Sequence, residues 1–208
     1  TPLTSMKGYI QVLQAKAKRD NLDFANKALD GADRQVGKMT SMINGFLNVA
    51  RLESGKIMMD FKKTYQVELV KEGVEQYIPS ATGHEFIQKY DGELTILADW
   101  DKLGQVINNL ISNALKYSPG NSQISIDCYQ KNNCAVFSIK DFGMGIRATD
   151  LPKLFERFYR VENQKTATVA GFGIGLYLSS EIIARHGGKI WAESEFGKSS
   201  TFFFSIPL

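Results

Sequence analysis

The chain has 208 residues, of which 43% are hydrophobic and 23% charged, as in ordinary globular proteins. Its 25 Lys and Arg against 22 Asp and Glu leave a formal net charge of +3, too small an excess to indicate a nucleic-acid partner. Two cysteines, Cys128 and Cys134, and two histidines argue against a disulfide framework or a structural zinc site and favour a reducing compartment. No run reaches the ~18 apolar residues of a membrane span, and no signal peptide opens the chain.

Residues 1–55 carry two helical patterns of apolar side chains. The first stripe comprises Leu3, Met6, Ile10, Leu13 and Ala17; the second comprises Ala25, Ala28, Ala32, Val36, Met39, Ile43, Phe46 and Ala50, with Leu29, Met42 and Leu47 beside it. Spacings of three and four residues predict two amphipathic helices, and the short polar connector at 18–21 predicts an antiparallel hairpin. Because two helices bury little, we expect a homodimer through residues 1–56, forming a four-helix bundle. The alternative is that the hairpin packs on the C-terminal part of its own chain.

The rest of the chain, residues 57–208, mixes strand and helix patterns. Strands are predicted over 62–67, 85–90, 94–98, 123–129, 135–140, 189–194 and 200–206, and helices over 68–77, 101–117 and 174–186. Residues 147–170 have weak periodicity and predict a long loop. Gly55 suits the cap that ends the second hairpin helix, which places the domain boundary at residue 56. The predicted fold class is α+β, with the hairpin followed by a sheet whose helices lie on one face.

The predicted helix over 101–117 carries the first candidate for chemistry. Asn109, Asn113, Lys116 and Tyr117 fall on one of its faces by the three-to-four residue rule. An amide oxygen can bind Mg²⁺, a lysine can neutralise phosphate, and a tyrosine ring can flank a base or ribose. The alternative for the asparagine pair alone is helix capping or hydrogen bonding to the backbone.

Two glycine clusters are the other candidates. Asp141-Phe142-Gly143-Met144-Gly145-Ile146 follows a strand and allows a tight turn with close backbone approach. Gly171-Phe172-Gly173-Ile174-Gly175-Leu176 opens a helix whose N–H groups could hold phosphate. The alternatives are a plain strand-to-loop turn and a simple helix entry. A eukaryotic-type protein kinase is excluded because no His-Arg-Asp catalytic loop is present, and a P-loop because Ala192 stands where Gly is needed.

Taken together, these three clusters, about thirty residues apart, resemble the ATP-binding domain of two-component sensor histidine kinases. The first is similar to the family's N box and the others to its two glycine boxes. Residues 154–160 (Leu-Phe-Glu-Arg-Phe-Tyr-Arg) resemble its F box, and the opening Thr-Pro-Leu-Thr-Ser resembles the tail of its phosphoacceptor motif. The resemblance implies a dimerisation and histidine-phosphotransfer hairpin followed by a Bergerat-type α/β sandwich.

The resemblance also implies roles for individual residues. Asn113 would coordinate Mg²⁺, Asn109 and Lys116 would hold the phosphates of ATP, and Tyr117 would line the pocket. Asp141 would accept a hydrogen bond from the adenine amino group. The remaining implied nucleotide contacts are Gly143, Gly145, Ile146, Phe155, Arg160, Gly171, Phe172, Gly173, Ile174, Gly175 and Leu176. Arg157 or Arg160 would stabilise charge on the transferred phosphoryl group from a lid over 147–170, hinged at the second glycine cluster.

The choice between transfer and hydrolysis depends on one position. In the gyrase-type, chaperone and mismatch-repair ATPases of this fold, a glutamate four residues before the metal-binding Asn activates water. Here that residue is Asn109, and a neutral amide cannot act as a general base. The expected activity is therefore an ATP-dependent protein-histidine kinase that passes phosphate on to an aspartate of a response regulator. The alternative is a non-catalytic nucleotide-sensing dimerisation scaffold.

There is one departure from the family pattern. The phosphoacceptor His of the family lies four residues ahead of the position that Thr1 matches, and it is not in this chain. We therefore expect the chain to bind Mg²⁺-ATP without phosphorylating itself, with Thr1 at the position that orients water in the reverse, phosphatase reaction. We expect this chain to be a cytoplasmic part of a larger protein. Any contact of that protein with the inner membrane would be through segments upstream of this chain.

Overall fold

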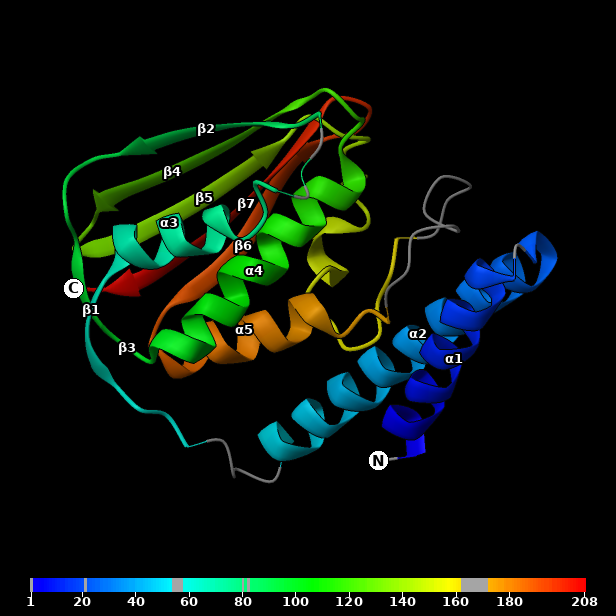
Figure 1. Ribbon diagram of the computed structural model, residues 1–208. Helices are drawn as coiled ribbons and strands as arrows, with labels where there is room; N and C mark the ends of the chain where they lie inside the picture. The colour runs from blue at the N-terminus through cyan, green and yellow to red at the C-terminus, as the bar shows by residue number, and fades with distance from the viewer. Residues whose placement is uncertain (1, 21, 54–57, 80, 82, 162–171) are drawn as a thin grey trace. The chain divides into compact units, whose positions relative to one another are not determined.

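The computed structural model describes residues 2–20, 22–53, 58–79, 81, 83–161 and 172–208 (Figure 1). The chain divides into two compact units, Thr1–Glu53 and Ser54–Leu208, whereas the sequence analysis placed the boundary at residue 56. Thr1, Gly171 and most of the second half of the expected lid lie outside the described residues. Along the described ranges, no helix combines the length and the apolar character that crossing a membrane requires.

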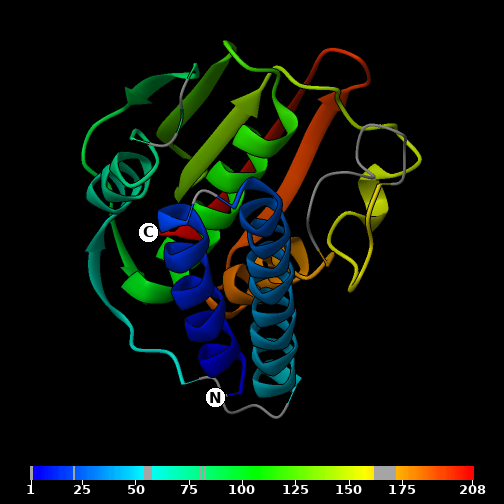
Figure 2. The same cartoon turned by 45° about the vertical axis from the view of Figure 1, so that its right-hand side comes forward.

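The first unit is the predicted helical hairpin. Helix α1 (Pro2–Arg19) and helix α2 (Asp23–Glu53) lie side by side and run in opposite directions (Figure 2). The Gln14 side-chain amide donates a hydrogen bond to the Asp30 carboxylate at 2.8 Å across the pair. The helical periods read from the sequence are therefore confirmed.

The hairpin leaves much of its apolar surface in solvent. Ile10, Ala17 and Val36 of the predicted stripes are buried. Val49, which was not part of the predicted stripe, is buried as well, whereas Ala50, which was part of it, is exposed. Five apolar side chains of α2 are 45–55% exposed: Met39, Met42, Ile43, Phe46 and Leu47. Helix α2 has 31 residues and α1 only 18, so α1 cannot cover the whole apolar stripe of its partner.

The second unit contains a five-stranded mixed sheet in the order β2-β4-β5-β7-β6. Its strands are β2 (Glu85–Tyr90), β4 (Gln123–Lys131), β5 (Cys134–Asp141), β6 (Lys189–Glu195) and β7 (Ser199–Pro207). β2 and β4 are parallel, and the other neighbours are antiparallel. Helices α3 (Gln66–Glu75), α4 (Trp100–Tyr117) and α5 (Gly175–Arg185) cover one face of this sheet (Figure 1). The predicted α+β class is confirmed.

Alternation of apolar residues builds the core between sheet and helices. Along β7 the side chains of Ser200, Phe202, Phe204 and Ile206 are buried, one every second residue. Phe204 stacks on Phe137 of β5 with ring centroids 4.9 Å apart. Helix α4 completes the core with Leu103, Val106, Ile107, Leu110 and Ile111, each fully buried, so its opposite face is left for polar side chains.

Two short strands stand apart from this sheet. β1 (Lys62–Tyr65) and β3 (Thr95–Ala98) form a separate antiparallel ladder. The predicted strand over 62–67 ends two residues early because α3 begins at Gln66, whose backbone N–H donates to the Leu94 carbonyl at 3.0 Å. A 3₁₀ turn, η1 (Leu151–Lys153), is the described regular element within the expected lid.

Candidate functional site

A cavity of about 260 Å³ lies in the second unit. Its walls come from α4, the segment after β5, residues 154–161, the start of α5 and strand β7. The sequence-predicted residues that line it are Asn109, Asn113, Lys116, Tyr117, Asp141, Gly145, Ile146, Arg160, Phe172, Gly173, Gly175 and Leu176. Residues from three separate sequence clusters therefore meet around one space.

Helix α4 supplies the polar wall of the cavity. Asp99 caps the helix by accepting a hydrogen bond from the Lys102 backbone N–H at 3.0 Å. The apolar face fixes the rotation of the helix against the sheet, and Asn109, Asn113 and Lys116 consequently face the cavity. The expectation that these side chains share one face is confirmed.

Asn109 is held by helix α5. Its side-chain amide donates a hydrogen bond to the Ser179 hydroxyl at 3.0 Å. A Cβ added to Gly175 would lie 2.5 Å from the Asn109 amide oxygen, so a side chain at this position would force the Asn109 amide to move. The orientation of Asn109 therefore depends on two residues about one turn apart at the start of α5.

Asp141 is the buried acid of the cavity. It ends β5 between Ile124 of β4 and Ser200 of β7, and its side chain is 4% exposed. One carboxylate oxygen accepts a hydrogen bond from the Gly143 backbone N–H at 2.9 Å. Burial raises the pKa of Asp141 to about 6, and the Gly143 N–H opposes that shift. Near neutral pH this is a desolvated carboxylate that favours a hydrogen-bond donor or a proton.

The two glycines after Asp141 permit close approach of backbone. A Cβ at Gly143 would lie 2.2 Å from the Tyr117 carbonyl oxygen, and a Cβ at Gly145 would lie 2.2 Å from the Glu195 carbonyl oxygen. Gly145 also has a φ of 64°, which side-chain-bearing residues rarely adopt. Gly143 itself does not line the cavity; it keeps the loop close to α4.

The second glycine cluster meets the end of the F-box-like segment. The Phe158 backbone N–H donates to the Gly173 carbonyl at 2.9 Å. Gly173 has a φ of 68°, and a Cβ there would lie 2.6 Å from the Phe158 carbonyl carbon. Phe172, Gly175 and Leu176 line the cavity, whereas Ile174 is buried beside it.

The two candidate arginines are placed differently. Arg160 lines the cavity. Burial raises the pKa of the Tyr117 phenol, and the Arg160 charge acts in the opposite direction, which shows that the two side chains interact. The Arg157 guanidinium lies 4.6 Å from the centre of the Phe158 ring, and neither it nor Phe155 lines the cavity.

Sequence reasoning missed part of the lining: Met144, Leu154, Tyr159, Val161, Ser200 and Phe202. The Tyr159 hydroxyl donates to the Asp150 carboxylate at 2.9 Å, which ties this segment to the turn before η1. Ser200 and Phe202 follow from the alternation along β7. Their place beside Asp141, however, depends on a register between strands that are sixty residues apart in the chain.

The lining chemistry suits a phosphorylated nucleotide with a divalent cation. Lys116 and Arg160 are cationic, and Asn113 offers an amide oxygen. Among the described residues, no cluster of three His, Cys, Asp or Glu side chains could hold a metal ion. A Mg²⁺ ion at Asn113 would therefore need phosphate oxygens and water as its other ligands, which is its usual mode of binding.

Two protein families match the chain. Residues 98–208 match the family described as histidine kinase-, DNA gyrase B- and HSP90-like ATPase, and residues 1–55 match the His Kinase A (phospho-acceptor) domain. Along its full length the chain is 35% identical to sensor histidine kinase WalK of Bacillus subtilis and 31% identical to sensor protein kinase WalK of Staphylococcus saprophyticus. It covers 34% of each, so it spans about a third of the length of these relatives.

Solved structures give the same picture. Full-length ShkA, determined in complex with AMPPNP, matches the whole chain with a TM-score of 0.78 and 25% identity, and the match covers 43% of ShkA. The catalytic domain of the histidine kinase ThkA matches 72% of this chain and 96% of that domain, with a TM-score of 0.63 and 29% identity.

Proposed function

This chain belongs to the sensor histidine kinases and forms a two-component kinase core, and from that premise we propose that its cavity binds Mg²⁺-ATP for phosphoryl transfer to a histidine. A single observation carries the proposal: the buried carboxylate of Asp141 and the polar side chains of Asn113, Lys116 and Arg160 line one cavity. A base with an exocyclic amino group fits the first, and a metal triphosphate fits the others. The nucleotide-sensing scaffold is not favoured.

Each end of the nucleotide has a partner of matching chemistry. Asp141 accepts the hydrogen bond of the adenine amino group, and the walls formed by Ile146, Leu176 and Phe202 exclude water from the base. Lys116 and Arg160 neutralise phosphate charge, and Arg160 rather than Arg157 stabilises charge on the phosphoryl group during transfer. Asn113 would hold the Mg²⁺ ion, which supplies further neutralisation of the phosphate oxygens.

Asn109 favours transfer over hydrolysis. It stands four residues before Asn113, and its amide already donates to Ser179 at 3.0 Å. A neutral amide held in this way cannot take a proton from water. The domain therefore keeps its ATP until a protein nucleophile arrives, and hydrolysis in the absence of that nucleophile is slow.

The accepting histidine is neither of the two in this chain. His186 is buried, its Nδ1 lies 2.8 Å from the Ile182 carbonyl, and its Nε2 accepts the Asp99 N–H. His84 lies just before the edge strand β2, whereas the cavity is bounded by β7, α4 and α5. The acceptor is the family's histidine ahead of the Thr1 position, and the next acceptor is an aspartate of a response regulator; Thr1 orients water in the reverse reaction.

The hairpin of residues 1–56 holds two copies together. The apolar side chains of α2 that α1 leaves exposed form the contact surface. Light scattering at micromolar concentration should give a dimer for the unmodified chain, and Phe46→Glu should give a monomer. Asn44→Glu, an exposed polar position on the same helix, is the matched control. A monomeric unmodified chain would remove this part of the proposal.

Phosphate transfer is tested with the full-length parent protein and γ-labelled ATP. The expected product is phosphate that is stable in base and labile in acid, as phosphohistidine is. Asn113→Ala should abolish the label. The 208-residue chain alone should bind Mg²⁺-ATP and remain unlabelled. Binding of ATP by the parent without any acid-labile label would favour the scaffold instead.

A further inference from the structure

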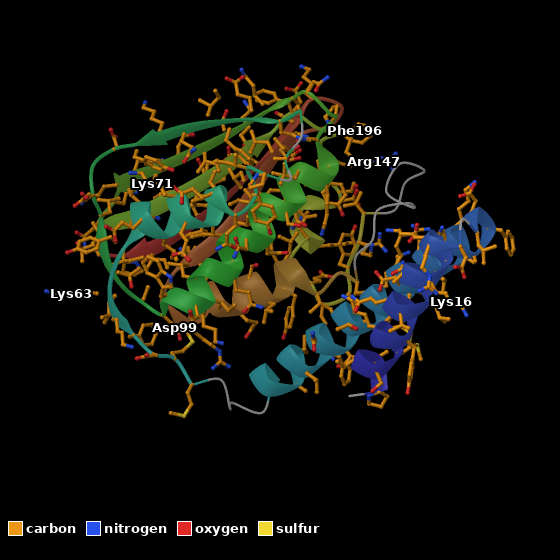
Figure 3. All side chains as sticks on the ribbon, in the orientation of Figure 1. Lys16, Lys63, Lys71, Asp99, Arg147 and Phe196 are labelled. Carbon is orange, nitrogen blue, oxygen red and sulfur yellow. The ribbon has the colours of Figure 1, made fainter. Side chains whose placement is uncertain are left out.

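The turn between β6 and β7 contacts the loop of residues 142–147, which follows Asp141 at the base end of the cavity. Arg147 and Phe196 lie together at one end of the sheet (Figure 3), with the guanidinium 5.1 Å from the centre of the ring. The Gly197 backbone N–H donates to the Met144 carbonyl at 2.7 Å. A Cβ at Gly145 would meet the Glu195 carbonyl. The loop after Asp141 is thus pressed against this turn along residues 144–147.

Ser194 is the polar centre of this contact. Its hydroxyl oxygen accepts a hydrogen bond from the Ile146 backbone N–H at 2.8 Å and donates one to the Ser199 carbonyl at 2.7 Å. The Ser200 hydroxyl lies 3.1 Å away. Ile146 and Ser200 both line the cavity, and Ser194 does not.

The loop depends on such contacts because it has no strand partner. After Asp141 the chain leaves β5, and residues 142–147 form neither helix nor strand. Its backbone groups must therefore find partners elsewhere. If the Ser194 hydroxyl were lost, the Ile146 N–H would be left half-buried without that acceptor, and the loop could relieve the cost by moving away from the turn.

We propose that Ser194 is a positioning residue for base recognition: it fixes Ile146, and through it the loop that follows Asp141, without touching the nucleotide. This inference rests on the proposed function, since it deepens the assignment of the base end of the cavity. It separates that end from the phosphate end, because Asn113 and Lys116 lie on α4 whereas Ser194 lies on β6. A change at Ser194 should affect recognition of the base and leave recognition of phosphate intact.

The test uses two ligands, Mg²⁺-ATP and Mg²⁺-tripolyphosphate, measured by calorimetry on the 208-residue chain. Ser194→Ala should weaken ATP binding by about tenfold, the effect of one lost hydrogen bond, and reduce the preference for ATP over GTP. Binding of tripolyphosphate should be unchanged, which also shows that the variant is folded. Ser194→Thr keeps the hydroxyl and should restore ATP binding. Ser180→Ala, which removes a hydroxyl bonded to the Tyr177 carbonyl on α5, is the matched control and should bind both ligands normally.

A second variant guards against failure of Ser194→Ala to fold. Arg147→Ala removes an exposed side chain from the same contact and should weaken ATP binding by about threefold, again with tripolyphosphate unaffected. Equal losses for ATP and tripolyphosphate, no loss at all, or a Ser194→Thr chain as weak as Ser194→Ala would overturn the role of Ser194. An unmodified chain that binds neither ligand would instead overturn the proposed function.

Discussion

Two buried aspartates at different ends of the α4–α5 pair are used in opposite ways. Asp99 precedes α4 and is 6% exposed, and Asp141 ends β5 beside the cavity and is 4% exposed. The two carboxylate oxygens of Asp99 accept hydrogen bonds from the backbone N–H groups of Asp60 at 2.9 Å and Lys102 at 3.0 Å. Asp141 accepts the Gly143 N–H at 2.9 Å and otherwise faces the cavity.

The pKa values record this difference. Burial acts to raise the pKa of Asp99, but the hydrogen bonds from Asp60 and Lys102, together with the nearby Lys102 charge, act against it and hold the pKa below its usual value. At Asp141 burial outweighs the Gly143 hydrogen bond, and the pKa rises to about 6. A carboxylate with enough donors stabilises the fold. A buried carboxylate with too few donors destabilises the ligand-free protein when it is ionised, and it favours a ligand that brings a hydrogen-bond donor.

His186 completes the polar cluster around Asp99, at the end of the α4–α5 pair that we call the closed end. The cavity lies at the other end, which we call the open end. Its Nε2 accepts a hydrogen bond from the Asp99 N–H at 3.0 Å, and its Nδ1 lies 2.8 Å from the Ile182 carbonyl oxygen. Phe61 packs edge-on against the imidazole, with the two ring centroids 5.2 Å apart. Figure 3 places Asp99 at the start of α4, away from Arg147 and Phe196. The same two helices thus carry a hydrogen-bonded polar cluster that stabilises the fold and, at the cavity, a second polar cluster to which we assign nucleotide binding.

Glycine substitutions should break this comparison most strongly. Gly143→Ala places a Cβ 2.2 Å from the Tyr117 carbonyl oxygen, so Tyr117 or Asp141 must move, and the Kd for Mg²⁺-ATP should rise by about a hundredfold. Gly187→Ala is the matched change at the closed end, where the nearest atom is 3.8 Å away and φ is 68°. It should cost about 1 kcal/mol of stability and leave ATP affinity unchanged. Calorimetry that finds equal losses of affinity would contradict the distinction.

Substitution of the two aspartates should separate stability from binding. Asp99→Ala removes a helix cap and leaves backbone donors unmet, so the free energy of unfolding should fall by about 2–4 kcal/mol while the folded protein still binds ATP. Asp141→Asn should weaken ATP binding without lowering the free energy of unfolding. Because the folded pKa of this acid lies above its unfolded value, ionisation destabilises the empty domain as pH rises from about 4 to 6. The Asp141→Asn chain should therefore be more stable than the unmodified chain at pH 7.5. Urea denaturation measures the free energy of unfolding of both variants.

The metal prediction concerns the open end alone. Asn113→Ala should weaken ATP binding in Mg²⁺ by at least about tenfold, the usual effect of disturbing a metal site, and should leave binding in EDTA unchanged. Gln105→Ala removes an exposed amide about two turns earlier on the same helix and should have no effect. Undiminished Mg²⁺-ATP affinity in a folded Asn113→Ala chain would refute the metal assignment.

The smallest expected effect is on pH dependence. In the proposed complex the ionised form of Asp141 accepts a hydrogen bond from the adenine amino group, so affinity for ATP should fall as pH drops through about 6. Between pH 7.5 and 5.5 the loss should be about fourfold, the ratio of ionised fractions. Asp141→Asn cannot titrate and should give a flat profile over this range. A profile for the unmodified chain as flat as that of the variant would sink this role.

What the sequence predicted well is local. The spacing of Asn109, Asn113 and Lys116 places them on one helix face wherever that helix lies, because the helical period is fixed by backbone geometry. The glycines after Asp141 likewise indicate close approach of backbone without saying to what. The classes and order of nearly all elements followed from periodicity in the same way.

What the sequence did not predict depends on contacts between distant segments. The pairing of Asp141 with Ser200, and of Asp99 with His186, joins residues that no local pattern relates. No local pattern predicts that the Asp99 backbone N–H donates a hydrogen bond to His186 Nε2, 87 residues further along the chain. The burial of Val49 was also missed, because spacing along a helix does not show which of two adjacent apolar faces is covered.

The central claim, that Asp141 is a desolvated carboxylate that accepts a hydrogen bond from the base of ATP, is tested most directly by carbon NMR of the aspartate carboxyl groups during a pH titration. Without nucleotide, Asp141 should titrate near 6 and Asp99 below the usual aspartate range. With saturating Mg²⁺-ATP the midpoint of Asp141 should fall, because the adenine amino group stabilises its charged form, while the midpoint of Asp99 stays where it was. An Asp141 midpoint that Mg²⁺-ATP leaves in place would contradict the account.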